Sequence, residues 1–432
     1  MKSGKLFYIL FLFFVVISQT AFPDTGVNSP YSRQGLGLLG DHSASLNKPI
    51  GGTGVGVRLN NAINLLNPAS YSSVDTLTFL LDAGFTLQNG NYSENGVKLN
   101  ARNASFDYVA MQFRIAPTVG MTMALLPYSN VGYKFSNRED IRQEDNDYVS
   151  STNTYSGNGG LRQVVLGLGW SPFKFMAIGI NCSYLFGEIE HQIVNTYSGS
   201  SLSSSAQSSS TTIYPSKRVY DVRARAFELD AGLQLAIPLK NGSKLVIGAK
   251  YQPNMPVKGT EYIYNVTYDV TDDRVILADT TGIDNAFSLP EQFSAGVSYA
   301  DKKLLVAADF SIGLWSKAKS FNQYGRDNMR MSLGAMFTPD PLSKKFLLRT
   351  SYSVGCYYQT SYFTMNGNAG PNEIGVSAGF KLPLFNTFSS LAVTGQYASV
   401  SMGNGGGIRE NYLKLNIGLT FNDTWFAKWQ VQ

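Results

Sequence analysis

The sequence predicts an all-β protein, a fourteen-stranded antiparallel transmembrane β-barrel with an N-terminal plug (hatch) in its lumen. Composition is the first observation: charged residues make up 15% and aromatic residues 13% of the chain, whereas about 25% of an ordinary soluble domain is charged. Segments of about ten residues then alternate between apolar and polar side chains, as strands between lipid and a lumen do. Finally, short connections alternate with long ones, which is typical of barrels in outer membranes.

The first 21 residues have the pattern of a secretory signal peptide. Lys2 and Lys5 precede an apolar run, Leu6–Ile17, that is shorter than the about 20 residues of a membrane-spanning helix. We expect cleavage after Ala21 and export to the bacterial outer membrane. An uncleaved anchor is the alternative.

Strands follow from alternation with period two. In the segment 176–186, Met176, Ile178 and Ile180 share one face, whereas Ala177 and Gly179 lie on the other. The same test predicts fourteen strands in a barrel over residues 75–421, followed by a periplasmic tail, 422–432. They are 75–87, 104–114, 117–127, 161–171, 174–187, 219–237, 243–254, 288–299, 303–314, 328–338, 346–358, 373–382, 388–401 and 411–421.

The connections fix the orientation of the predicted barrel. Short turns are expected in the periplasm and long loops outside the cell, and an even number of strands returns the C-terminus to the periplasm. A serine-rich stretch, 198–212, is expected to be a solvated part of one loop. The long loops cover 88–103, 128–160, 188–218, 255–287, 315–327, 359–372 and 402–410.

Residues 22–74 are predicted to form the plug. A disordered tail would be richer in charge and poorer in Leu and Ile than this segment. Its glycines, Gly51, Gly52 and Gly54, allow sharp turns or close packing of the backbone. Asn67-Pro68-Ala69 then stops any helix and turns the chain before the first strand.

Strand parity predicts which charged side chains point into the lumen. The two signs are nearly balanced, which does not favour an ion-selective pore lined by one sign. The charges could pair inside a filled lumen, or face water-filled vestibules without partners. They are Asp82, Glu228, Asp230, Asp309, Glu373, Lys250, Arg330, Arg349, Lys381 and Lys414.

Three features resemble the FadL-type outer-membrane transporters of hydrophobic compounds. They are the plug that ends in Asn67-Pro68-Ala69, the count of fourteen strands, and the pair 289–299 and 305–309 followed by Trp315-Ser316. The segment 28–37 also looks like the start of many Bacteroidota barrel proteins. The resemblance implies a monomeric barrel with a movable hatch, in which loops such as 128–160 and 255–287 capture a hydrophobic ligand. The ligand would then leave sideways through the wall.

Passive uptake of a hydrophobic small molecule, of the long-chain fatty acid type, is therefore the expected function. The alternative is a non-transporting partner subunit of an outer-membrane secretion or assembly complex, similar to PorV-like proteins. Outer-membrane lipid and other outer-membrane proteins are the expected partners. Nucleic acid is not an expected partner, because the sequence contains no block of basic residues. We expect no enzyme activity, because neither His42 nor His191 lies in a catalytic motif, and no metal or cofactor, because Cys182 and Cys356 lie on distant strands.

Overall fold

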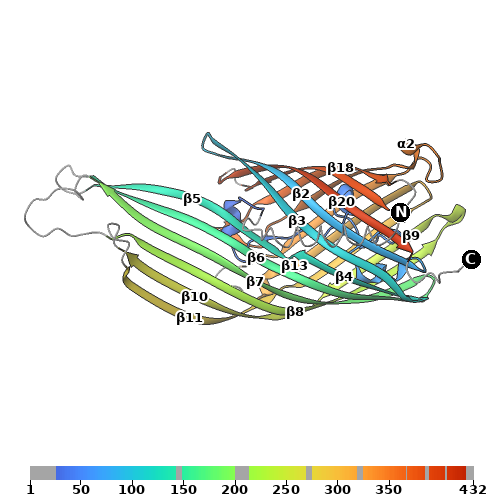
Figure 1. The fold of residues 1–432 in the computed structure, drawn as a ribbon, viewed down its shortest axis with the longest axis horizontal. Helices are drawn as coiled ribbons and strands as arrows, with labels where there is room; N and C mark the ends of the chain where they lie inside the picture. The colour runs from blue at the N-terminus through green and yellow to red at the C-terminus, as the bar shows by residue number, and fades with distance from the viewer. Residues whose placement is uncertain are drawn as a thin grey trace, which may run out of the picture.

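The computed structural model describes residues 26–142, 148–199, 214–268, 275–318, 325–365, 367–384, 389–403 and 406–424. These residues are almost entirely β-structure, and their strands close an antiparallel barrel (Figure 1). Within them, no helix is long and apolar enough to cross a membrane. The predicted signal peptide, residues 200–212 of the serine-rich stretch and residues 425–432 lie outside the described ranges.

The wall consists of fourteen strands, as predicted, and closes where β20 pairs with β2. Three of the fourteen are interrupted, so each appears as two elements: β4 with β5, β9 with β10, and β11 with β12. Proline, which cannot donate to a strand ladder, accounts for two interruptions, at Pro253 and Pro290. The elements are β2 (Thr78–Glu94), β3 (Val97–Ala116), β4 (Val119–Pro127), β5 (Ser129–Arg142), β6 (Tyr148–Phe173), β7 (Met176–Gly199), β8 (Ser216–Pro238), β9 (Lys244–Gln252), β10 (Met255–Tyr268), β11 (Val275–Leu289), β12 (Glu291–Ala300), β13 (Leu304–Leu314), β14 (Asn328–Phe337), β15 (Ser351–Gln359), β18 (Asn372–Pro383), β19 (Ser390–Ser401) and β20 (Arg409–Thr424).

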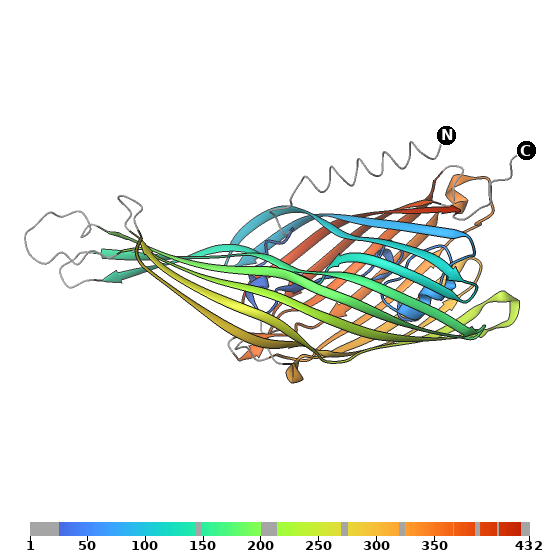
Figure 2. The same ribbon diagram turned by 60° about the horizontal axis from the view of Figure 1, so that its bottom comes forward.

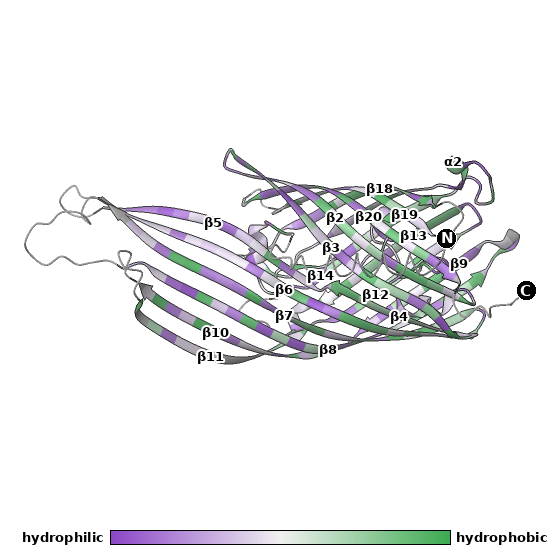
Figure 3. Ribbon diagram, viewed as in Figure 1, coloured by the Kyte–Doolittle hydropathy of each residue, from purple (hydrophilic) through white to green (hydrophobic). Residues whose placement is uncertain are grey.

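Several segments that the sequence analysis assigned to loops are strands. Residues 128–160, 188–218 and 255–287 are largely built into β5–β8, β10 and β11, which continue past the barrel as one twisted sheet (Figures 1 and 2). We call this sheet the wing. Alternation failed to predict the wing because its strands contain many polar residues, as the largely purple and white colouring of the wing shows (Figure 3). Its strands instead contain many Tyr, Thr and Val residues, which favour β-structure.

The barrel itself shows the predicted alternation. Large apolar side chains are exposed on its outer surface; on β6 these are Val164, Leu166, Leu168 and Trp170. The residues between them face inward, and Gln163 and Val165 are buried. An apolar exterior of this kind requires lipid, so the barrel belongs in an outer membrane.

Residues 26–77 precede the wall and lie in the barrel, seen as the blue segments enclosed by the strands in Figure 2. This segment has little regular structure: η1 (Pro30–Arg33), β1 (Leu38–Leu39), η2 (Lys48–Ile50) and η3 (Pro68–Ser73). Side chains of the segment such as Ile50, Val57, Ile63 and Tyr71 are at most 1% exposed. The N-terminal plug that the sequence predicts is therefore present.

Two predicted strand ends differ in the structure. Residues 346–349 form a short helix, α2 (Phe346–Arg349), so Arg349 lies in the turn before β15 and not on a strand facing the lumen. At the other end, β20 continues to Thr424. The smaller elements η5 (Lys240–Gly242), η6 (Trp315–Lys317), β16 (Thr364–Met365) and β17 (Asn368–Ala369) lie in connections.

Candidate functional site

Hydrogen bonds connect the plug to the barrel wall. The Asp309 carboxylate on β13 accepts bonds from the backbone N–H groups of Gly54 (2.5 Å) and Val55 (2.8 Å). On β8, the Gln234 side chain donates to the carbonyl groups of Val55 (3.0 Å) and Val57 (3.1 Å). Because this turn of the plug has no regular structure of its own, wall side chains satisfy its backbone.

Asn67 organises the second half of the plug. Its side chain accepts from the N–H of Ala69 (3.0 Å), which caps η3, and Pro68 occupies the first position of that helix. The Asn67 amide also donates to the carbonyl of Val55 (2.8 Å). Asn67 therefore connects the glycine-rich turn to η3, and all three residues Asn67, Pro68 and Ala69 are buried.

Glycines on the inner face of the wall let the plug backbone approach closely. A Cβ atom at Gly248 would lie 2.0 Å from the carbonyl oxygen of Val55, and one at Gly334 would lie 2.2 Å from that of Ile50. Gly51 and Gly52 of the plug have φ angles of 73° and 77°, which favour glycine. Plug and wall are thus complementary in backbone shape.

Several charged residues predicted to face the lumen have partners there. Asp82 accepts from the hydroxyl groups of Ser45 (2.6 Å) and Tyr108 (3.1 Å). The Lys250 ammonium lies 3.4 Å from the Asp230 carboxylate. Arg330 donates to the Gly51 carbonyl (3.3 Å), so it also contacts the plug.

The remaining predicted charges occupy different places. Glu228 is buried beside the lumen, and Glu373 accepts from the Tyr357 hydroxyl (2.6 Å). Lys414 lies 5.4 Å from the centre of the Tyr412 ring. Lys381 is half-buried on β18, and Arg349 lies in the turn described above.

Two acidic lumenal residues were missed by strand parity. Asp107 forms a salt bridge with Lys48 of the plug (2.6 Å), although its neighbour Tyr108 also points inward. The register of β2 and β3 shifts here, because Gly84 pairs with Tyr108 and Phe85 with Phe106. This bulge frees Asp107 to turn inward. Glu410, which accepts from Ser29 (2.7 Å), was missed because β20 begins two residues earlier than predicted.

The wall has a gap between β3 and β5. Pairing of β3 with β4 covers only residues 109–116 of β3, and residues 97–108 pair with β2 alone. In the described chain, β5 pairs with β6 along its length and with β1 at Leu38–Leu39. The start of the plug covers both edges: Asn28 donates to Asn103 of β3 (2.8 Å), and Gly40 donates to the Tyr128 carbonyl (2.7 Å).

A cavity of about 430 Å³ leads from the lumen to this gap. At the gap its mouth is mainly apolar, with Val27, Leu39, Phe106 and Leu125 around it, and Arg162 is the charged residue among them. Charged side chains line its inner end, namely Asp41, Lys48, Asp107, Arg330, Glu373, Glu410 and Lys414. The cavity therefore offers an apolar region at the wall and a polar region inside the barrel.

A second cavity, of about 160 Å³, adjoins the first at Asp41 and Arg330. Burial alone would raise the pKa of Asp41, but Arg330, Lys48 and a hydrogen bond from the Ser43 backbone N–H (3.0 Å) outweigh it, so the pKa is lowered. Burial lowers the pKa of His42, and the nearby Lys250 lowers it further. Asp41 is thus ionised and His42 neutral at pH 7.

The described residues contain no group of His, Cys, Asp and Glu side chains arranged to hold a metal ion. Cys182 and Cys356 are free and exposed on the outer surface. His191 contacts the Tyr133 hydroxyl (2.9 Å) at the base of the wing, and His42 contacts Gln163 (3.3 Å).

Comparison with known proteins gives a family and a fold. A family model described as BamG matches residues 5–432. No curated protein matches the chain. Among solved structures, the toluene transporter TodX of Pseudomonas putida is 13% identical, with a TM-score of 0.58 over 90% of this chain and 100% of that one.

Two further structures are similar. The toluene transporter TbuX of Ralstonia pickettii is 11% identical, with a TM-score of 0.54 over 90% of this chain and 99% of that one. A FadL homologue of Pseudomonas aeruginosa is 11% identical, with a TM-score of 0.54 over 88% and 98% of the two chains. At these identities the likeness shows a FadL-like fold.

Proposed function

The chain belongs to the BamG family, and we propose that it passes hydrophobic small molecules across the outer membrane without energy input. The observation that supports this proposal is the cavity that leads from the charged lumen to the gap between β3 and β5. A barrel that only sealed the membrane would gain nothing from an interrupted wall. The gap lies beside exposed apolar residues, including Leu87 and Leu125, so its mouth faces lipid.

The shape of the cavity favours an amphiphile with one ionised group, such as a long-chain fatty acid. Its apolar tail would lie at the mouth against Leu39 and Phe106, and its carboxylate would reach Lys48, Arg330 or Lys414 at the inner end. A charged group needs such partners once it leaves water. Below the cavity the plug fills the lumen, so direct passage to the periplasm requires the plug to move.

Narrowing the mouth tests this proposal. Leu39→Trp places a large side chain in the cavity, whereas Leu347→Trp adds the same side chain to the exposed α2 and serves as a matched control. Cells that make each variant would be given radiolabelled oleate or toluene. We expect slower uptake for Leu39→Trp and wild-type uptake for Leu347→Trp. Transport would be refuted if cells lacking the chain took up each substrate as fast as cells that make either variant.

The wing favours a second candidate function, a partner subunit of an outer-membrane secretion or assembly complex. It is an open sheet: within the described strands, β11 pairs only with β10, and β5 pairs with one wall strand, β6, and with β1 of the plug. Exposed strand edges can pair with another chain. Uptake alone does not require such an extension.

Trimming the wing separates the two candidates. Asn137 pairs with Asn153, so replacing residues 138–152 by a short Gly-Ser turn leaves matched strand ends. Native extraction in mild detergent followed by mass spectrometry would report stoichiometric partners. Loss of a partner with unchanged oleate uptake supports the second function, whereas a wild-type chain without partners contradicts it.

A further inference from the structure

The outer surface of β6–β8 changes from apolar to polar at one level. Below it, Val164, Tyr184 and Phe227 are 46%, 37% and 62% exposed. Tyr184 packs against Phe227 and Phe186, with ring centroids 5.2 Å and 5.9 Å apart. Aromatic clusters of this kind mark the boundary between the hydrocarbon of a membrane and its headgroups.

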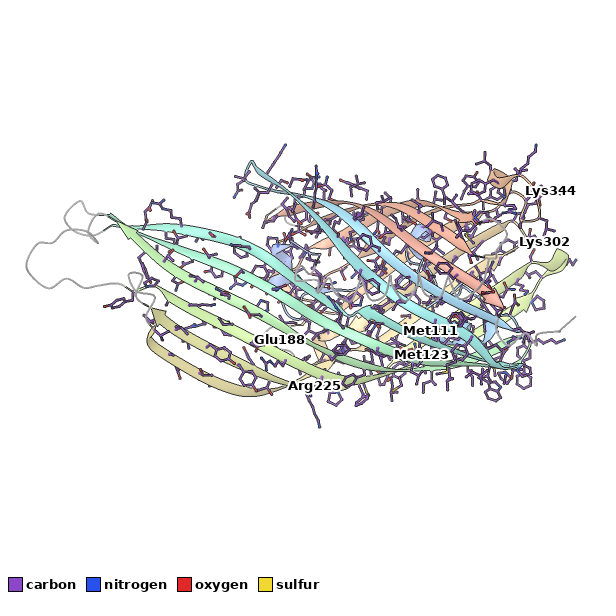
Figure 4. The ribbon with its side chains drawn as sticks, viewed as in Figure 1. Met111, Met123, Glu188, Arg225, Lys302 and Lys344 are labelled. Atoms are coloured by element: carbon purple, nitrogen blue, oxygen red, sulfur yellow. The ribbon has the colours of Figure 1, made fainter. Side chains whose placement is uncertain are left out.

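Three cations lie at this boundary in one cross-strand row. Arg162 pairs with Phe186, Phe186 with Arg225, and Arg225 with Lys258. The row spans four neighbouring strands on the outer face, where Phe186, Arg225 and Lys258 are exposed. Figure 4 shows Arg225 projecting from the wall, with Glu188 labelled nearby.

Arg225 and Lys258 are directly opposite each other, and like charges in that position destabilise a sheet. Among the side chains that the structure describes, neither of them forms a salt bridge. Glu188, two positions along β7 from Phe186, is engaged with Arg223 (3.6 Å). An anion from outside the chain would remove this repulsion.

We propose that this row binds the phosphate group of an anionic lipid in the outer leaflet. Arg225 and Lys258 would hold the phosphate, since an arginine can bind it with two parallel hydrogen bonds. The acyl chains would lie along Tyr184 and Phe227 below it. Arg162 also lines the cavity mouth, so the bound lipid would stand beside the wall gap. The site does not depend on whether the chain transports a ligand.

Native mass spectrometry of the full-length chain in mild detergent tests the site. The probes are phosphatidylglycerol and phosphatidylcholine with the same acyl chains. The test variant is R225Q/K258Q, and the matched control is K302Q/K344Q, which removes two exposed lysines from the opposite end of the barrel (Figure 4). Each lost cation should weaken binding about fivefold.

We expect the wild type to hold phosphatidylglycerol more tightly than phosphatidylcholine. R225Q/K258Q should weaken its tightest phosphatidylglycerol site at least tenfold, since the effects of about fivefold multiply, whereas K302Q/K344Q should keep it. Equal affinity for the two lipids, or equal loss in both variants, would overturn the proposal. Displacement of the lipid by an equal concentration of inorganic phosphate would also overturn it, because the row would then recognise free phosphate. Heat-modifiable migration on a gel confirms that each variant is folded.

Discussion

Removing the Asp309 carboxylate should release the glycine-rich turn of the plug while leaving the barrel intact. The carboxylate accepts two backbone bonds, from Gly54 and Val55, and hydrogen bonds to charged groups contribute about 1.5–3 kcal/mol each. Asp309→Ala should therefore lower the local stability of this turn by about 3–6 kcal/mol. Asp309→Asn keeps an acceptor oxygen but loses the charge, so its effect should be smaller.

Hydrogen exchange of the folded protein, followed by mass spectrometry of peptides covering residues 50–60, measures this effect. The lower limit of about 3 kcal/mol corresponds to exchange about a hundredfold faster. Asp301→Ala, in an exposed turn, is the control and should exchange as the wild type does. Heat-modifiable migration should be unchanged in all variants, because the wall ladder is untouched. Wild-type exchange in Asp309→Ala would refute the assigned role of this carboxylate.

Three further predictions concern the plug. Gly248→Val should displace the Val55 carbonyl and destabilise the plug by about 1–3 kcal/mol, which hydrogen exchange in residues 50–60 would report as a faster rate. The control is Gly395→Ala, whose Cβ would meet no atom closer than 3.9 Å and which should leave that rate unchanged. Deleting residues 22–74 should raise leakage of small solutes from liposomes, and unchanged leakage would contradict a sealing plug. Because burial lowers the pKa of His42, the unfolded plug binds a proton first as pH falls below about 6.5. Plug exchange should then accelerate on acidification in the wild type and stay flatter in His42→Gln.

The barrel could be predicted because lipid and lumen impose opposite demands on alternate residues of every strand. That rule selected Asp230 and Lys250 from the sequence, and the structure brings them together at 3.4 Å. It could not select Asp107, because the bulge beside Tyr108 breaks the alternation locally. Nor could it predict α2, since Arg349 continues an apolar stretch that reads as a strand.

Other features depend on contacts between distant parts of the chain. Inner-face glycines such as Gly248 and Gly334 look ordinary in sequence, and the reason for them is the plug backbone pressed against the wall. The strands of the wing contain many polar residues, so only the long antiparallel register reveals it as sheet. The period of apolar residues shows whether each side of a strand faces lipid or the lumen. It does not show which other part of the backbone packs against that strand.

The wall gap and the wing arise from the same strand. Up to Leu125, β4 is paired on both sides, with β3 and β6; from Leu126 the chain follows β6 without β3, and after Tyr128 it continues as β5 into the wing. Strand β3 remains paired with β2, so the edges of β3 and β5 separate, and the start of the plug covers both edges. A partner that pulled on the wing would therefore act on β5, and through β1 on the plug segment at the cavity mouth. The two proposed functions, transport and partner binding, would each use the place where β5 leaves β3. Trimming the wing beyond Asn137 keeps the gap, so uptake and partner assays on that variant distinguish the two proposals.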